Sequence, residues 1–197
     1  KDRPKWGFSL SLDTLKQKTE RLIEYGKQRN GYKTALSMLN ISFRNLGSLE
    51  SLEYIPPYDY PKSTFDYFCQ NCTNLKIVDS LNTSESTSFI MMVSGCVNLI
   101  AIYSPLDFSK PSSADKLNRV FRDCKALVTV SFVENSIPFS LSFAHSPLLS
   151  DESIQSIIDG LATVESSQTL TFHADVYNKL TDEQKQTIAR KNWRVAS

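Results

Sequence analysis

The apolar residues of this chain recur in units of about two dozen residues. Three units share one spacing, in which a first apolar residue is followed by others three, four, seven, ten and thirteen positions later, and these units begin at Phe65, Phe89 and Leu117. A weaker copy begins at Leu39 and a fading one at Phe139, so the steps between units are 26, 24, 28 and 22 residues. Units of this length are typical of leucine-rich repeats, which stack because one unit cannot bury its own apolar face.

Each unit predicts one short helix followed by one short strand. The spacing at its start places four apolar side chains on one stripe of a two-turn helix, as in residues 89–96. β-Branched and aromatic residues then surround the later apolar positions, as in 100–103 and 128–132, and these favour strands. Such strands would lie about 4.8 Å apart in a parallel ladder. We therefore expect an α/β fold, a leucine-rich repeat solenoid of about five irregular repeats, each a short helix plus a short parallel strand.

Both ends of the array carry predicted caps. Residues 13–29 have a helical apolar stripe that runs out at the following Asn-Gly pair, which indicates an N-terminal capping helix. After the repeats, residues 154–161 carry another stripe at helical spacing. Ser150 and Asp151 precede it and are suitable N-cap residues, so we expect a closing helix here.

The rest of the C-terminal cap predicts mixed structure. Residues 169–174 alternate as a strand does, Thr181 and Gln184 have the spacing of a capping box for a helix through about residue 190, and 193–195 favour a short extended piece. The predicted organisation is one continuous domain with three parts: an N-terminal segment and capping helix at 1–38, the repeats at 39–149, and an α/β C-terminal cap at 150–197.

Composition narrows the range of partners. The 197 residues are 41% hydrophobic and 22% charged, which is ordinary for a globular domain. Lys and Arg number 22 and Asp and Glu 21, so the net charge of +1 gives no reason to expect nucleic acid or an anionic membrane as a partner. No apolar run approaches the roughly 20 residues that cross a bilayer, and none has the pattern of a signal peptide. We expect no transmembrane segment.

The four cysteines are predicted to pack as apolar residues. Cys72, Cys96 and Cys124 occupy the same position in three units, which favours a buried column of free thiols. The second Cys-x-x-Cys pair that a structural zinc site usually needs is missing after Cys69-x-x-Cys72. A disulfide between Cys69 and Cys72 stays open as an alternative, although so short a loop would add little stability.

No residue pattern indicates catalysis. Only His145 and His173 could act as imidazole bases, and no local signature connects either one to Cys69, the cysteine outside the shared position. The spacings of dinucleotide-binding loops, P-loops, zinc proteases and EF-hands are absent from the sequence. We therefore expect a non-enzymatic protein with no catalytic, cofactor-binding or metal-binding residues.

Aromatic residues and prolines gather between the first two units. Residues 54–68 hold four Tyr and two Phe, interrupted by three prolines. Tyr58 and Tyr60 lie in the proline-bounded part, where aromatic rings offer contact area at low entropic cost. Two interpretations stay open: these rings contribute to a binding surface, or they cover the flank of the first repeats.

Three stretches resemble a known repeat. Residues 69–75, 93–99 and 121–127 read CQNCTNL, VSGCVNL and FRDCKAL, and they are similar to the F-x-x-C-x-N-L core of BspA-like leucine-rich repeats of bacterial surface proteins. The departures are Cys69 or Val93 at the Phe position and Ala126 in place of Asn. The tail from 148 to 195 also resembles the C-terminal cap found with such repeats in gut bacteria and their phages.

The resemblance implies a bacterial protein that is extracellular or attached to the cell envelope and that binds a macromolecule in adhesion. The expected partner is a protein or a glycan, with host extracellular matrix among the candidates. On the strand ladder, the side chains between the last two apolar positions of each unit are available to a partner. Tyr58 and Tyr60 lie near them in sequence. The predicted partner-binding residues are Lys76, Ile77, Ile100, Ala101, Val128, Thr129, Tyr58 and Tyr60. The alternative is a structural component of a phage tail or another assembly, in which the caps make the contacts.

Overall fold

The computed structural model of the chain describes residues 44–45, 47, 51–52, 64–78 and 81–197. The chain divides into two compact units, Lys1–Leu39 and Asn40–Ser197, and every described residue belongs to the second. The N-terminal segment predicted at 1–38, its capping helix, and Tyr58 and Tyr60 therefore lie outside the described residues.

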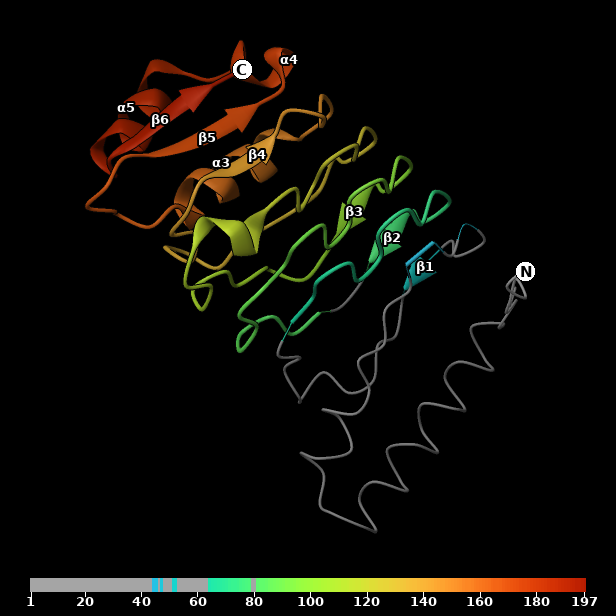
Figure 1. Cartoon of the computed structure of the whole chain (residues 1–197). Coiled ribbons are helices and arrows are strands. Elements are labelled where there is room, and N and C mark those ends of the chain that lie inside the picture. The colour runs from blue at the N-terminus through green and yellow to red at the C-terminus, as the bar shows by residue number, and fades with distance from the viewer. Residues whose placement is uncertain (1–43, 46, 48–50, 53–63, 79–80) are drawn as a thin grey trace, which may run out of the picture. The chain divides into compact units, whose positions relative to one another are not determined.

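Short strands from successive units pair side by side (Figure 1). β1 (Ser51–Leu52), β2 (Ile77–Val78) and β3 (Ala101–Ile102) form a parallel sheet in that order. The register pairs Ile77 with Ala101, which stand at equivalent positions in their units. In the next unit only isolated parallel bridges continue the ladder, from Ala101 to Thr129 and from Leu106 to Phe132. The strand predicted at 128–132 is thus reduced to single bridges.

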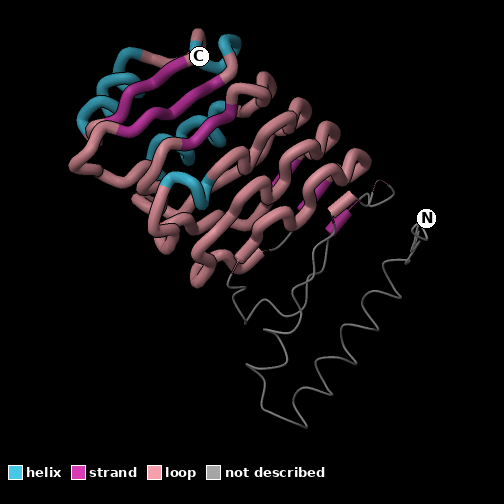
Figure 2. The backbone as a smooth tube through the Cα atoms, viewed as in Figure 1, coloured by secondary structure: helices cyan, strands magenta, loops and turns pink. Residues whose placement is uncertain are grey.

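The prediction of a helix at the start of a unit is wrong for three successive units, because residues 66–71, 90–95 and 118–123 form turns. The Phe68 N–H donates to the Phe65 carbonyl at 3.2 Å, and the Cys72 N–H donates to the Cys69 carbonyl at 3.1 Å. The residue before each donor has a positive φ, 55° at Tyr67 and 60° at Asn71. These are two consecutive four-residue turns of type II, in which the third residue takes a left-handed conformation. Figure 2 shows these segments as turns.

Hydrogen bonds to the neighbouring unit explain why turns replace the helix. Alternate N–H groups of one unit point at carbonyls of the next, whereas a helix would direct them to its own carbonyls. The four bonds from the second unit to the third measure 2.7 to 2.8 Å and run from Phe65 to Ser88, Tyr67 to Ile90, Cys69 to Met92 and Asn71 to Ser94. The third unit repeats the pattern toward the fourth, from Phe89 to Lys116, Met91 to Asn118, Val93 to Val120 and Gly95 to Arg122. The second and third units therefore satisfy these backbone groups through the unit that follows.

Residues at equivalent positions form columns in the core. The leucines that precede the ladder are Leu75, Leu99, Leu127 and Leu149, and all are at most 1% exposed. Aromatic rings also stack between units, with centroids 5.9 Å apart for Phe65 and Phe89 and 4.6 Å apart for Phe121 and Phe143. The repeat spacing thus identifies buried positions correctly even though the predicted helix is wrong.

The C-terminal cap combines helices with a second parallel sheet, as predicted for 150–197. A 3-10 helix, η1 (Ala114–Leu117), precedes it within the repeats. The cap contains the closing helix α3 (Asp151–Gly160), strand β5 (Gln168–Phe172), helix α4 (Ala174–Tyr177), helix α5 (Asp182–Arg190) and strand β6 (Trp193–Ala196). β4 (Leu141–Phe143), from the fifth unit, pairs with β5, and β5 pairs with β6.

Two predicted helix starts in the cap are confirmed. The Ser150 hydroxyl accepts the Ser153 N–H at the beginning of α3. Thr181 and Gln184 form the predicted capping box at the beginning of α5. Helix α4 was not predicted, because the alternating pattern of 169–174 extends past Phe172 and hides the His173 N-cap.

Candidate binding surface on the strand ladder

The structure brings the six predicted ladder residues together. Ile77, Ala101 and Thr129 share one register column. The preceding residues form the adjacent column, because the Ile100 N–H donates to the Lys76 carbonyl at 2.8 Å and the Val128 N–H donates to the Ile100 carbonyl at 2.9 Å. Backbone pairing therefore fixes the spacing of these residues across three units.

Only part of this set is accessible. Lys76 is exposed, and the Ile100 side chain is 45% exposed even though it is large and apolar. Ile77, Val128 and Thr129 are half-buried. Ala101 is 2% exposed, so it is not available to a partner. We keep the name ladder surface for Lys76, Ile77, Ile100, Val128 and Thr129.

Sequence reasoning missed an exposed aromatic residue on this ladder. Tyr103 follows β3 directly, and its N–H donates to the Val78 carbonyl at 3.0 Å. Its side chain is 55% exposed. The signal for it was the run of strand-favouring residues at 100–103, which the prediction used to place the strand but not to ask which of its members face outward.

The histidines are engaged in local polar contacts. His145 Nδ1 lies 2.7 Å from Asp123 Oδ1, and the same carboxylate is 3.4 Å from Arg122 Nε. His173 Nδ1 accepts the Asp175 N–H at the start of α4. Cys69 is fully buried, whereas His145 is exposed. The structure therefore does not bring a histidine and Cys69 together as a nucleophile and its base.

The cysteines are four free buried thiols, so the alternative disulfide between Cys69 and Cys72 is not formed. Cys96 Sγ donates to the Cys69 carbonyl at 2.9 Å, and Cys124 Sγ donates to the Val93 carbonyl at 3.2 Å. Desolvation raises the pKa of Cys96 from 9.0 to about 12, and the neighbouring Cys72 adds to the rise. A thiol with so high a pKa is a poor nucleophile.

An open hollow lies beside α3, but its chemistry is limited. It has a volume of about 750 Å³ and is lined by Phe132, Glu134, Glu152, Gln155, Ser156 and Asp159. Its titratable lining groups are all carboxylates. Within the described part of the chain, no three His, Cys, Asp or Glu side chains are placed to hold a metal ion.

Comparison with known proteins gives no further lead. No protein-family model, no curated protein and no solved structure matches this chain. None of the helices in residues 64–78 and 81–197 combines the length and the apolar character needed to cross a bilayer.

Proposed function

We propose that this chain is a non-enzymatic, macromolecule-binding leucine-rich repeat protein of the bacterial cell surface that acts in adhesion. It is a BspA-like solenoid, extracellular or attached to the cell envelope, with a protein or glycan partner. The observation that carries the proposal is the ladder surface, where accessible side chains recur on adjoining parallel units at fixed spacing.

The hydrogen-bonding pattern supports the solenoid. The four N–H groups of residues 65 to 71 are satisfied by carbonyls 23 residues later, and those of residues 89 to 95 by carbonyls 27 residues later. A backbone that depends on its neighbour in this way is stable as an array and not as a single unit. The same dependence gives the array a regular outer surface.

The composition of the ladder surface supports binding to a macromolecule. Ile100 exposes a large apolar side chain at the centre, with Tyr103 three residues later in the same unit. Lys76 and Thr129 supply polar groups in the neighbouring units. An apolar centre with polar groups around it is the usual composition of a protein interface.

The test is a binding assay on immobilised collagen, fibronectin, laminin and a panel of neutral glycans. For a partner that binds, Ile100→Glu should weaken binding about tenfold or more, because it places a charge at the apolar centre. Leu148→Glu is the matched control, since Leu148 is also apolar and 55% exposed but lies off the ladder surface. Absence of binding to every ligand, or equal loss in both variants with unchanged melting, contradicts the proposal.

One observation favours the alternative of a structural component in a phage tail or another assembly. β6 is the outer strand of the sheet β4, β5, β6, and among the described residues no strand pairs with its other edge. An open edge can pair with another chain. Concentration-dependent self-association in sedimentation experiments, unaffected by Ile100→Glu, would favour this function over adhesion.

A further inference from the structure

Basic residues are concentrated in one repeat unit. Residues 110–125 contain five of the eleven Lys and Arg residues found between 64 and 197. The rest of that range contains six basic and twelve acidic residues. A positively charged unit therefore lies within a part of the chain that is otherwise acidic.

Four of these basic residues lie along the turns of the fourth unit. We call Lys116, Arg119, Arg122 and Lys125 the basic stripe; Lys116 is half-buried and the other three are exposed. The residues between them that face the core are Leu117, Val120, Phe121 and Cys124, all at most 3% exposed. Arg119 and Arg122 thus occupy outward positions of the turns, with Lys116 before them in η1 and Lys125 in the turn that follows.

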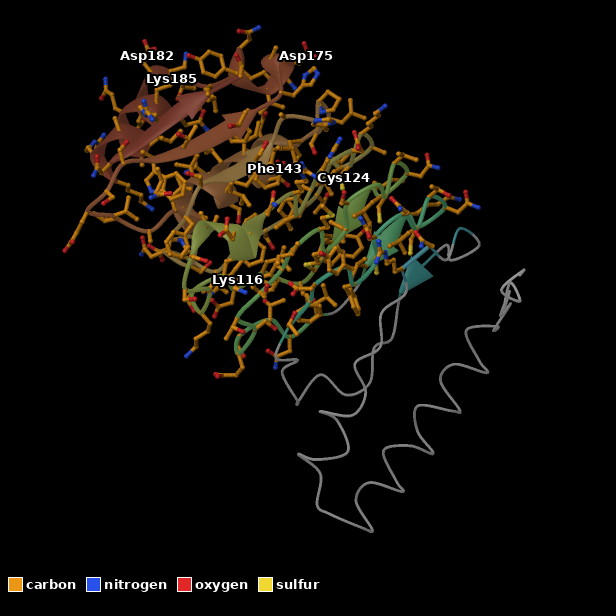
Figure 3. All side chains as sticks on the ribbon, in the orientation of Figure 1. Lys116, Cys124, Phe143, Asp175, Asp182 and Lys185 are labelled. Atoms are coloured by element: carbon orange, nitrogen blue, oxygen red, sulfur yellow. The ribbon has the colours of Figure 1, made fainter. Side chains whose placement is uncertain are left out.

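The basic stripe runs across the width of the unit. Lys116 belongs to η1, and Figure 3 shows it well apart from Cys124 of the same unit. In the third unit the residue that pairs with Arg122 is Gly95, whose N–H donates to the Arg122 carbonyl at 2.8 Å. Gly95 adds no charged side chain next to the stripe, and the Asn71 side chain lies against it.

The carboxylate within the stripe has partners of its own. Asp123 Oδ1 lies 2.7 Å from His145 Nδ1, and Oδ2 lies 3.4 Å from Arg122 Nε. Asp123 therefore interacts with the stripe and the neighbouring unit and offsets only part of the positive charge. Lys125 and Arg119 have no ion pair within 4.0 Å among the described residues.

We propose that the basic stripe binds a linear acidic polysaccharide, a chain that carries sulfate or carboxylate groups. A row of cations along one unit matches a linear polyanion, and guanidinium groups bind sulfate and carboxylate through paired hydrogen bonds. Single-stranded nucleic acid is less suited, because it needs aromatic rings on which bases stack. The flanking residues 90–97 and 144–148 contain no Phe, Tyr or Trp.

This inference rests on the proposed function in naming a glycan partner, but it places that partner on the turns and not on the ladder surface. The assay measures binding of the whole chain to dextran sulfate, polygalacturonate, neutral dextran and poly(dT). We expect binding to the two acidic polysaccharides that weakens as salt screens the charges, and no binding to neutral dextran.

The decisive variant is Arg119→Gln, Arg122→Gln, Lys125→Gln, which should weaken binding to dextran sulfate about tenfold or more, because three charged donors are lost. The control is Lys179→Gln, Arg190→Gln, Arg194→Gln, three exposed residues of the cap, with the same change in net charge and an expected change within about twofold. Both variants should melt as the parent does.

Equal loss in both triple variants, no binding to either acidic polysaccharide, or tighter binding to poly(dT) than to dextran sulfate overturns the inference. Ile100→Glu separates it from the proposed function, because that change should leave dextran sulfate binding intact. A chain that binds a matrix protein through Ile100 but not dextran sulfate would retain the proposed function and lose this inference.

Discussion

The Ser153 hydroxyl of α3 accepts the backbone N–H of Val130 at 3.0 Å, where a further strand of the ladder would place a carbonyl. Ser156, one turn later, accepts the Phe132 N–H at 2.9 Å. The Ser150 N–H in turn donates to the Val128 carbonyl at 3.0 Å. The closing helix therefore satisfies the open edge of the ladder at the fourth unit, which prevents further pairing there.

Ser153→Ala should destabilise the protein by about 1 to 3 kcal/mol, because it leaves the buried Val130 N–H without an acceptor. Urea unfolding at neutral pH measures the change. Ser167→Ala, at an exposed serine of the same cap, is the control and should change stability by less than about 0.5 kcal/mol. Equal stability of both variants would show that the hydroxyl does not close the edge.

The turns show where sequence reasoning reaches its limit. Apolar residues at the first, fourth, fifth and eighth positions of a unit face inward in a helix and equally in two consecutive type II turns, so the pattern identifies the buried residues without deciding the backbone. Hydrogen bonds to residues 23 or more positions away, such as the bond from Phe65 to Ser88, determine that the backbone forms turns and not a helix. Asn71 and Asp123, which tolerate a left-handed conformation, were the local signal for turns.

The candidate site was predictable to a similar degree. The repeat spacing alone is enough to place Ile77, Ala101 and Thr129 in one column, because residues at equivalent positions of parallel units pair. It could not show that Ala101 is buried while Tyr103 is exposed, since exposure depends on the sizes of neighbouring side chains in other units. Charge counted over the whole chain also hid the basic stripe, because acidic residues elsewhere balance it.

Gly95→Ala should destabilise the protein by about 1 to 3 kcal/mol. Gly95 has a φ of +79°, which an alanine adopts at a cost, and an added methyl group would collide with the Asn71 side-chain oxygen. Thermal and urea unfolding measure the loss. Gly47→Ala is the matched control, because Gly47 lies outside the left-handed region and its new methyl would meet only Thr73 Oγ1, at 3.5 Å.

The two causes of the Gly95→Ala effect can be separated. Adding Asn71→Ser to Gly95→Ala shortens the colliding side chain but leaves the backbone strain, so part of the lost stability should return. No coupling between the two substitutions in a double-mutant cycle would mean that only the backbone conformation matters.

Lys191→Met should destabilise the cap by about 1 to 2 kcal/mol. Lys191 Nζ donates to the carbonyls of Ile158, Asp159 and Leu161 at 2.6 to 3.2 Å, so it caps the C-terminal end of α3 with a positive charge. Urea unfolding and hydrogen exchange of the α3 amides measure the effect. Lys179→Met, at an exposed position, should leave both unchanged. Equal exchange of α3 in the two variants would contradict the capping role.

The buried thiols should make the protein less stable at alkaline pH. Burial raises the pKa of Cys96 from 9.0 to about 12 and that of Cys124 well above 9.0. A thiol whose pKa is raised in the folded state makes its full contribution to the free energy of unfolding below pH 9. This contribution is lost as the pH rises toward 12, because in that range the unfolded chain releases the proton and the folded chain keeps it. Between pH 9 and about pH 12, each such thiol should lower the free energy of unfolding by about 1 kcal/mol per pH unit.

Urea unfolding at pH 8, 9 and 10 under reducing conditions tests this expectation. The variant Cys96→Ala, Cys124→Ala removes both titrating groups, so its stability should fall less steeply with pH than that of the parent, whatever stability it loses at pH 8. Native-state alkylation gives an independent reading: at pH 8 a thiol with a pKa near 12 is ionised in about one molecule in ten thousand, so iodoacetamide should label Cys96 only after unfolding. Parallel pH profiles for parent and variant, together with rapid labelling of the folded chain, would mean that these sulfur atoms are not enclosed between the units.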